Sequence, residues 1–194
     1  MKTPLPAKYA DLEREPGPLM LLEALRLHGT LEMKGPGDNP TIVGWADEVA
    51  KASSTAYTRW AADWYNADSI AWCGLFMAVV AVRASQGRPE RMPPPKYLAA
   101  ADWVNFGKAV PQTAAMLGDV LVFTRDGGGH VGLYVGEDAD YFHVLGGNQA
   151  DAVNITRIAK KRCAAVRRPI YNNQPANVRK IHRIATGAVS TNEA

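Results

Sequence analysis

Cysteine is scarce in this chain of 194 residues, which contains only Cys73 and Cys163. Two thiols are too few for the disulfide framework of a small secreted scaffold, so we expect no bridge between them. Long apolar runs are also absent, which predicts no stable membrane insertion. Residues 1–6 lack the apolar core of a signal peptide, so we expect synthesis in a cytoplasm.

Motifs for metals, nucleotides and nucleic acids are missing as well. The two cysteines and four histidines do not show zinc-ligand spacing. No glycine-rich phosphate loop or nucleic-acid motif occurs. Asp63, Asn66 and Asp68 offer oxygen ligands ahead of Cys73, but they fall short of a full calcium pattern. The sequence therefore predicts no metal, no cofactor and no nucleic-acid partner. The net charge of +3 fits a polyanionic partner without requiring one.

The first half of the chain carries helical patterns. Pro18–His28 shows apolar residues at helical spacing, and Asn39 or Thr41 can cap a second helix. Residues 73–85 are apolar on nearly every face, which predicts a buried helix. Tyr97–Phe106 has the pattern of another short helix.

The second half carries strand patterns. Five short segments rich in β-branched or aromatic residues are separated by turn signals, and their close spacing favours antiparallel hairpins. These segments are Val120–Thr124, His130–Gly136, Tyr141–Leu145, Val153–Ile158 and Cys163–Arg167.

Helices followed by strands define an α+β domain, here with N-terminal helices packed on a five- to six-stranded antiparallel sheet. With 47% hydrophobic and 21% charged residues, the composition suits one globular unit. We expect an N-terminal extension over 1–17, a folded domain over 18–170 and a basic tail over 171–194. The tail is expected to form a surface helix with a loose end.

Cys73 is the candidate nucleophile. It opens the buried helix, with Asp68 and Ser69 shortly before it as candidate caps. A helix N-terminus supplies partial positive charge and unpaired N–H donors, which favour a thiolate. The backbone N–H of Cys73 is also a candidate oxyanion donor. The alternative is a buried structural cysteine.

His130 is the candidate base. It follows three glycines and begins an alternating strand, so its ring can face the mouth of a cleft. A Cys–His pair also needs a group that holds the imidazole in the right tautomer. Asn148, at the end of the next strand, is the predicted third member. Glu137 and His143 are the rivals, with Glu137 placed at the far end of its strand.

These residues stand in four motifs that resemble a known family. The motifs Trp-Cys-Gly-x-Phe, Gly-Asp-Val-Leu-Val-Phe, Gly-His-Val-Gly-Leu-Tyr-Val-Gly and Leu-Gly-Gly-Asn-Gln start at Trp72, Gly118, Gly129 and Leu145. In this order they resemble the CHAP and NlpC superfamily of cell-wall cysteine peptidases and amidases, most closely its phage- and prophage-associated branch. The resemblance covers residues 20–170 and implies a papain-like fold.

The resemblance implies catalytic roles for three residues. Cys73 is similar to the nucleophile, His130 to the base and Asn148 to the third polar residue. CHAP relatives often place a glutamate two positions before that asparagine, where this chain has Gly146. Trp72, Tyr134 and Gln149 are predicted to bind substrate, and Trp103 is a further groove candidate. A core position is the alternative for Trp72 and Trp103.

The implied function is hydrolysis of an amide bond in bacterial peptidoglycan by a thiolate mechanism. The bond would lie in the stem peptide or join muramic acid to alanine. Such a chain would be a monomeric endolysin, made in the bacterial cytoplasm and reaching the wall after lysis or by dedicated export. The alternatives are an exported interbacterial amidase toxin and a non-catalytic wall-binding or tail-structural module.

Overall fold

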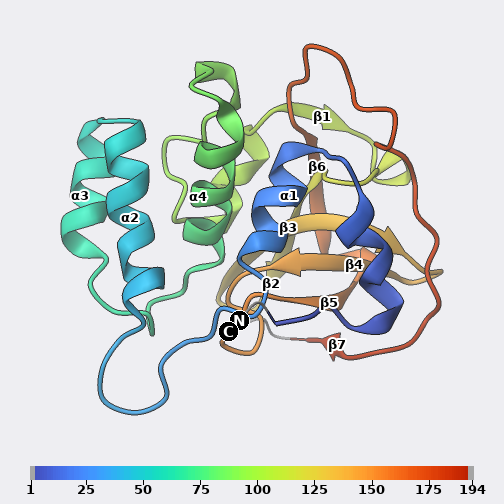
Figure 1. Ribbon diagram of the computed structural model, residues 1–194, viewed down its shortest axis with the longest axis horizontal. Helices are drawn as coiled ribbons and strands as arrows, with labels where there is room; N and C mark the ends of the chain where they lie inside the picture. The colour runs from blue at the N-terminus through green and yellow to red at the C-terminus, as the bar shows by residue number, and fades with distance from the viewer. Residues whose placement is uncertain (1–2, 192–194) are drawn as a thin grey trace.

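The computed structural model describes residues 3–191 and has helices in its first half and strands in its second (Figure 1). The α-helices are α1 (Leu19–Arg26), α2 (Pro40–Ala52), α3 (Ala56–Trp64) and α4 (Cys73–Ser85). Short 3-10 helices are η1 (Ala7–Arg14), η2 (Pro89–Arg91), η3 (Ala100–Asn105), η4 (Gln112–Ala114) and η5 (Lys160–Arg162). The strands are β1 (Lys108–Val110), β2 (Val120–Arg125), β3 (Gly128–Glu137), β4 (Tyr141–Gly146), β5 (Asn154–Ala159), β6 (Cys163–Arg168) and β7 (Val189–Ser190).

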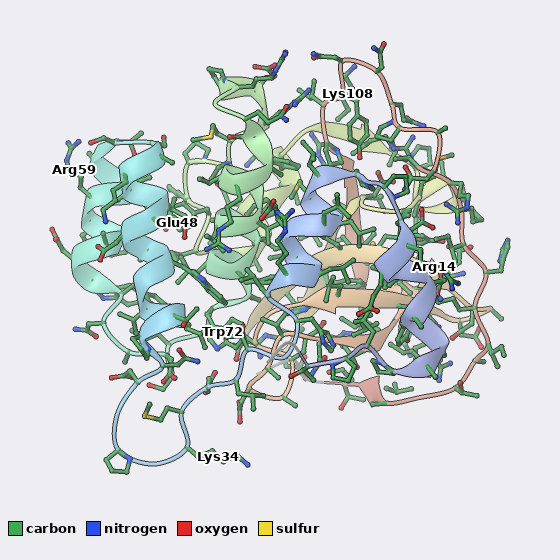
Figure 2. All side chains as sticks on the ribbon, in the orientation of Figure 1. Arg14, Lys34, Glu48, Arg59, Trp72 and Lys108 are labelled. Carbon is green, nitrogen blue, oxygen red and sulfur yellow. The ribbon has the colours of Figure 1, made fainter. Side chains whose placement is uncertain are left out.

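The helix starts follow local capping chemistry. The Asn39 side chain accepts a hydrogen bond from the Thr41 N–H, and Pro40 occupies the first turn of α2, as expected for a cap at Asn39. The apolar sequence of α4 is buried almost throughout, which confirms the buried helix predicted over 73–85. Two guanidinium hydrogen bonds of 2.7 Å from Arg83 to Glu48, labelled in Figure 2, join α4 to α2.

The sheet has seven strands in the order β1-β6-β2-β3-β4-β5-β7. All five predicted strand segments are present, and neighbours among β1 to β6 pair antiparallel. The expectation of five or six antiparallel strands was too low. Two short strands, β1 and β7, form the edges of the sheet, and β7 runs parallel to β5. The structure is therefore α+β with a mixed sheet.

Two apolar clusters hold the layers together. The larger lies between the helices and one face of the sheet, where α4 and α1 pack closely together (Figure 1). The smaller uses the alternate side chains of the same strands, because successive side chains point to opposite faces. Its members are Ala115, Leu121, Phe123, Tyr134, Phe142, Val144, Ile158 and Val166. This arrangement buries the central strands on both faces.

The C-terminal segment differs from its prediction. No helix forms over 171–191; the chain runs extended across the sheet and ends in β7. Its basic side chains find separate partners instead, with Arg179 on Glu15 and Arg183 on Asp11 of the N-terminal segment. Residues 1–2 and 192–194 of the predicted extension and tail lie outside the described residues.

Three smaller expectations can be compared with the structure. The segment 97–106 is helical only as the 3-10 turn η3. Neither Cys73 nor Cys163 forms a disulfide. Within residues 3–191, no helix is both long and apolar enough to cross a membrane.

Candidate active site

Cys73 lies at the first position of α4, as the sequence predicts, but the helix start is built differently. The preceding residue, Trp72, is the N-cap and offers no side-chain cap. The carboxylate of Asp68, expected to cap this helix, instead accepts backbone hydrogen bonds of 2.8 Å from Met33 and Asn39. Asp68 therefore fixes the preceding loop, and the donors of the first turn of α4 remain directed at the thiol.

The thiol is 5% exposed and lies against the start of β3. Burial is the strongest influence on it and raises the pKa of Cys73 above its usual value. The N–H groups of Val131 and Gly74 and the charge of Arg125 act in the opposite direction. Val131 follows His130 directly, so the backbone of the candidate base is in contact with the candidate nucleophile.

Gly74 has a packing role. A Cβ at this position would stand 2.3 Å from the carbonyl oxygen of Tyr97 and 2.6 Å from that of Leu98. The absent side chain thus lets the segment 97–98 approach the first turn of α4 closely.

His130 is 1% exposed and stacks on Phe123 of β2, with ring centroids 6.4 Å apart. Its Nε2 lies 3.1 Å from Oε1 of Gln149. The amide of Gln149 is itself fixed, because its Nε2 donates to the carbonyl oxygens of Asn154 at 2.8 Å and Val144 at 3.3 Å. The amide oxygen therefore faces the imidazole.

This contact determines the tautomer. An amide oxygen can only accept a hydrogen bond, so Nε2 of His130 must carry the proton. In the neutral ring the lone pair then belongs to Nδ1. Neutral imidazole with a lone pair on Nδ1 can remove a proton from a thiol. Gln149 thus acts on His130 as an orienting group would in a Cys–His site.

Gln149 occupies the position next to the imidazole for which Asn148 was predicted. Asn148 is buried and adopts a left-handed backbone conformation with a φ of 56°. Its role in catalysis stays a prediction. Both residues carry amides, and the local backbone turn, which the sequence pattern does not reveal, brings the side chain of Gln149 to His130. The signal was the Asn-Gln pair, from which we predicted Asn148 for this position and Gln149 for substrate binding.

The two rivals for the third position serve other networks. His143 on β4 binds the Tyr9 hydroxyl through Nδ1 at 2.6 Å and Asp138 through Nε2 at 3.1 Å. Glu137, at the far end of β3, lies 3.3 Å from Lys180 and 3.6 Å from Lys160. These contacts place both residues in the attachment of the terminal segments to the sheet.

The predicted substrate-binding aromatics lie in the core. Trp72, labelled at the start of α4 in Figure 2, is fully buried and donates from Nε1 to Glu32 at 2.5 Å. Tyr134 is also fully buried, and its hydroxyl donates to the Ile181 carbonyl oxygen. Trp103 donates from its indole to the Tyr97 carbonyl oxygen. Burial of this kind favours the core alternative stated for Trp72 and Trp103, and it extends to Tyr134.

Comparisons with protein-family models, with curated proteins and with solved structures found no match. Within residues 3–191, no group of three or more histidine, cysteine or acidic side chains is placed to hold a metal ion.

Proposed function

We propose that this chain is a cysteine peptidase or amidase of the CHAP and NlpC superfamily, with a papain-like fold, that hydrolyses an amide bond of bacterial peptidoglycan. One observation carries the proposal. The thiol of Cys73, at the N-terminus of α4, lies against the start of β3, where Gln149 holds His130 in the tautomer of a general base. The four motifs that resemble the family contain all three residues.

The mechanism uses these groups in sequence. Nδ1 of His130 takes the thiol proton, and the Cys73 sulfur attacks the carbonyl carbon. The N–H of Cys73 stabilises the oxyanion. The imidazolium then protonates the leaving amine as the C–N bond breaks, and a thioester remains. Water, activated by His130, attacks the thioester; the carboxylic acid leaves and the thiol is restored.

Gly146 departs from the family pattern, which often has glutamate there, and the structure offers a physical reason. A Cβ at residue 146 would stand 2.9 Å from Oε1 of Gln149 and 3.1 Å from Nε2 of His130. Any side chain would thus compete with the amide for the same space. We infer that in this chain the polar partner of His130 is Gln149, which lies three residues after Gly146.

The two cysteines provide a matched test. Cys73→Ala is expected to lower muropeptide release from purified sacculi by at least ~10³-fold with an unchanged fold. Cys163→Ser should keep full activity, because the hydrogen bond of that thiol goes to the Ala165 carbonyl oxygen within its own strand. Retained activity in the Cys73 variant would refute the proposal.

The bond that is cut can be read from the products. Mass spectrometry of digested sacculi distinguishes the two activities that we propose as alternatives. Split stem peptides identify an endopeptidase, and free lactyl groups on muramic acid identify an amidase. The phage-associated branch of the resemblance favours a lysis enzyme as the biological setting.

A second candidate, a non-catalytic wall-binding or tail-structural module, is favoured by the burial of Cys73 and the raised pKa of its thiol. Alkylation by iodoacetamide at neutral pH separates the two. A catalytic pair should alkylate within minutes at Cys73 and more slowly after His130→Ala. Equal and slow alkylation of Cys73 and Cys163 would favour the module.

A further inference from the structure

A pocket of about 490 Å³ lies between the loop that follows β4 and the outer edge of β5. Its lining mixes polar residues with small or aliphatic ones. The lining residues are Gln149, Ala150, Asn154, Ile155, Thr156, Ala188, Val189, Ser190 and Thr191.

This pocket adjoins the candidate active site through Gln149. The same side chain that contacts His130 at 3.1 Å also binds the Asn154 carbonyl oxygen at 2.8 Å. Asn154 returns a 2.7 Å hydrogen bond to the backbone of Gln149. The first residue of β5 is therefore coupled to the imidazole through one side chain.

The loop that forms one wall is backbone-strained. Asn148, Ala150 and Asp151 have φ values of 56°, 51° and 59°, a region that non-glycine residues rarely adopt. Such conformations are energetically unfavourable and persist where the surroundings fix them. Here Asp151 accepts a 2.9 Å hydrogen bond from the Glu32 N–H. Strain held in this way is typical of ligand sites.

The edge of β5 is open beside the pocket. Arg157 points its N–H outward, to the Ala188 carbonyl oxygen at 3.2 Å. Peptide groups alternate in direction along a strand, so Ile155 also faces outward. Ile155 pairs with Leu145 of β4 on one side; on the other side, within residues 3–191, β7 pairs with Arg157 and Ile158 and no strand pairs with Ile155. The N–H and carbonyl of Ile155 therefore face the pocket.

We propose that this pocket binds the peptide part of the substrate as an added strand, paired with Ile155 on the open edge of β5. The chain's own extended segment already uses this edge, since the Ala188 carbonyl oxygen pairs with Arg157. Gln149, which lines the pocket, also contacts His130. The inference rests on the proposed function, and it gives the stem peptide rather than the sugar chain as the main recognition element.

Two alanines of the C-terminal segment provide the test. Both are exposed, but Ala188 lines the pocket whereas Ala185 does not. In a Cys73→Ala background, the protein should bind soluble muropeptides, and binding should shift the Ile155 amide resonance. Adding Ala188→Trp should weaken this binding at least ten-fold. Ala185→Trp should change the affinity for muropeptides by less than two-fold. Glycan strands freed of stem peptides should not shift the Ile155 amide resonance.

In the active chain, the same pair of variants is compared by KM on muropeptides. Equal KM values for the two tryptophan variants, or amide resonance shifts confined to residues outside the pocket, would overturn the inference. If the parent chain still hydrolyses its substrate, the proposed function remains intact. Absence of both hydrolysis and muropeptide binding would overturn both. A raised KM for Ala188→Trp alone supports the added strand.

Discussion

Two buried histidines on neighbouring strands, His130 on β3 and His143 on β4, are held in superficially similar ways. Each ring has its Nε2 3.1 Å from a side-chain oxygen. At His130 the oxygen belongs to the neutral amide of Gln149. At His143 it belongs to the carboxylate of Asp138, which also binds Arg157 at 2.8 Å. The difference lies in the other neighbours of each residue.

The Nδ1 of His143 is engaged by the hydroxyl of Tyr9 at 2.6 Å, and Tyr9 belongs to η1, far away in sequence. This histidine joins the N-terminal segment to the sheet. The backbone following His130 instead contacts a thiol. A similar hydrogen bond at Nε2 can thus serve a histidine that attaches a terminal segment or one proposed to transfer a proton. The second neighbour, a tyrosine hydroxyl or a cysteine thiol, distinguishes the two cases.

The largest expected effect separates the two rings by activity. His130→Ala should lower hydrolysis of sacculi by about 10²–10⁴-fold, because the general base is lost. Its unfolding free energy should fall by only about 1–2 kcal/mol, since Gln149 loses one donor. His143→Ala should keep the activity of the folded fraction. Activity assays on protein verified as folded by circular dichroism check this. Equal activity losses would show that the two sites are not functionally distinct.

Next in size is the stability of the His143 site. Asp138→Ala removes the hydrogen-bond acceptor of both His143 and Arg157. Because the Arg157 side chain is only 10% exposed, the loss should lower the unfolding free energy by about 3–5 kcal/mol. The exposed Asp140 is the matched control, and Asp140→Ala should cost less than about 0.5 kcal/mol. Urea denaturation measures both. A cost below 1 kcal/mol for the Asp138 variant would contradict a buried charge network.

A smaller effect concerns which amide orients His130. Gln149→Ala should lower kcat by about 10²-fold, because the imidazole loses its position, while KM for a short substrate changes less. Asn148→Gly keeps the left-handed backbone and should leave kcat within two-fold. Gln149→Glu should move the acid limb of the pH–rate profile upward, since a carboxylate favours the imidazolium. A larger loss at residue 148 would return the third role to Asn148.

These outcomes bear on what the sequence can predict. Composition and periodicity were sufficient for the α+β class, for the buried helix 73–85 and for five strands, because each signal is local and repeated. The short strands β1 and β7 were not predicted, because segments of three and two residues are too short to show a strand periodicity. The C-terminal segment was expected to be helical from its basic residues, but partners distant in sequence, such as Asp11 for Arg183, hold it extended.

The site shows the same division at the level of side chains. Cys73 and His130 could be proposed from sequence because a helix start and a strand start are visible locally. The choice between Asn148 and Gln149 depends on three left-handed residues in one loop, and Ala150 and Asp151 carry no sequence signal for that conformation. Burial of Trp72 and Tyr134 likewise depends on packing across the whole domain.

The last and smallest effect is the pH dependence of stability at His143. Burial, with the nearby charges of Lys8 and Arg157, lowers the pKa of His143 below its usual 6.5, although Asp138 acts in the opposite direction. The unfolded chain therefore takes up a proton near pH 6.5 while the folded chain does not, so stability is full above that pH and falls as the pH drops toward the folded pKa.

The pKa of Asp138 is also lowered, so its contribution is lost mainly below about pH 5, and the difference between the parent chain and His143→Gln from pH 7 to pH 5 reports the histidine. The slope in that window approaches ~1.4 kcal/mol per pH unit for one proton. Urea unfolding at several pH values should give the steepest slope for the parent chain, a smaller one for Tyr9→Phe, and the flattest for His143→Gln. An unchanged slope in His143→Gln would mean that folding does not shift the pKa of this ring, and a contribution of opposite sign would make His143 a charged ion-pair partner of Asp138 rather than a neutral link to Tyr9.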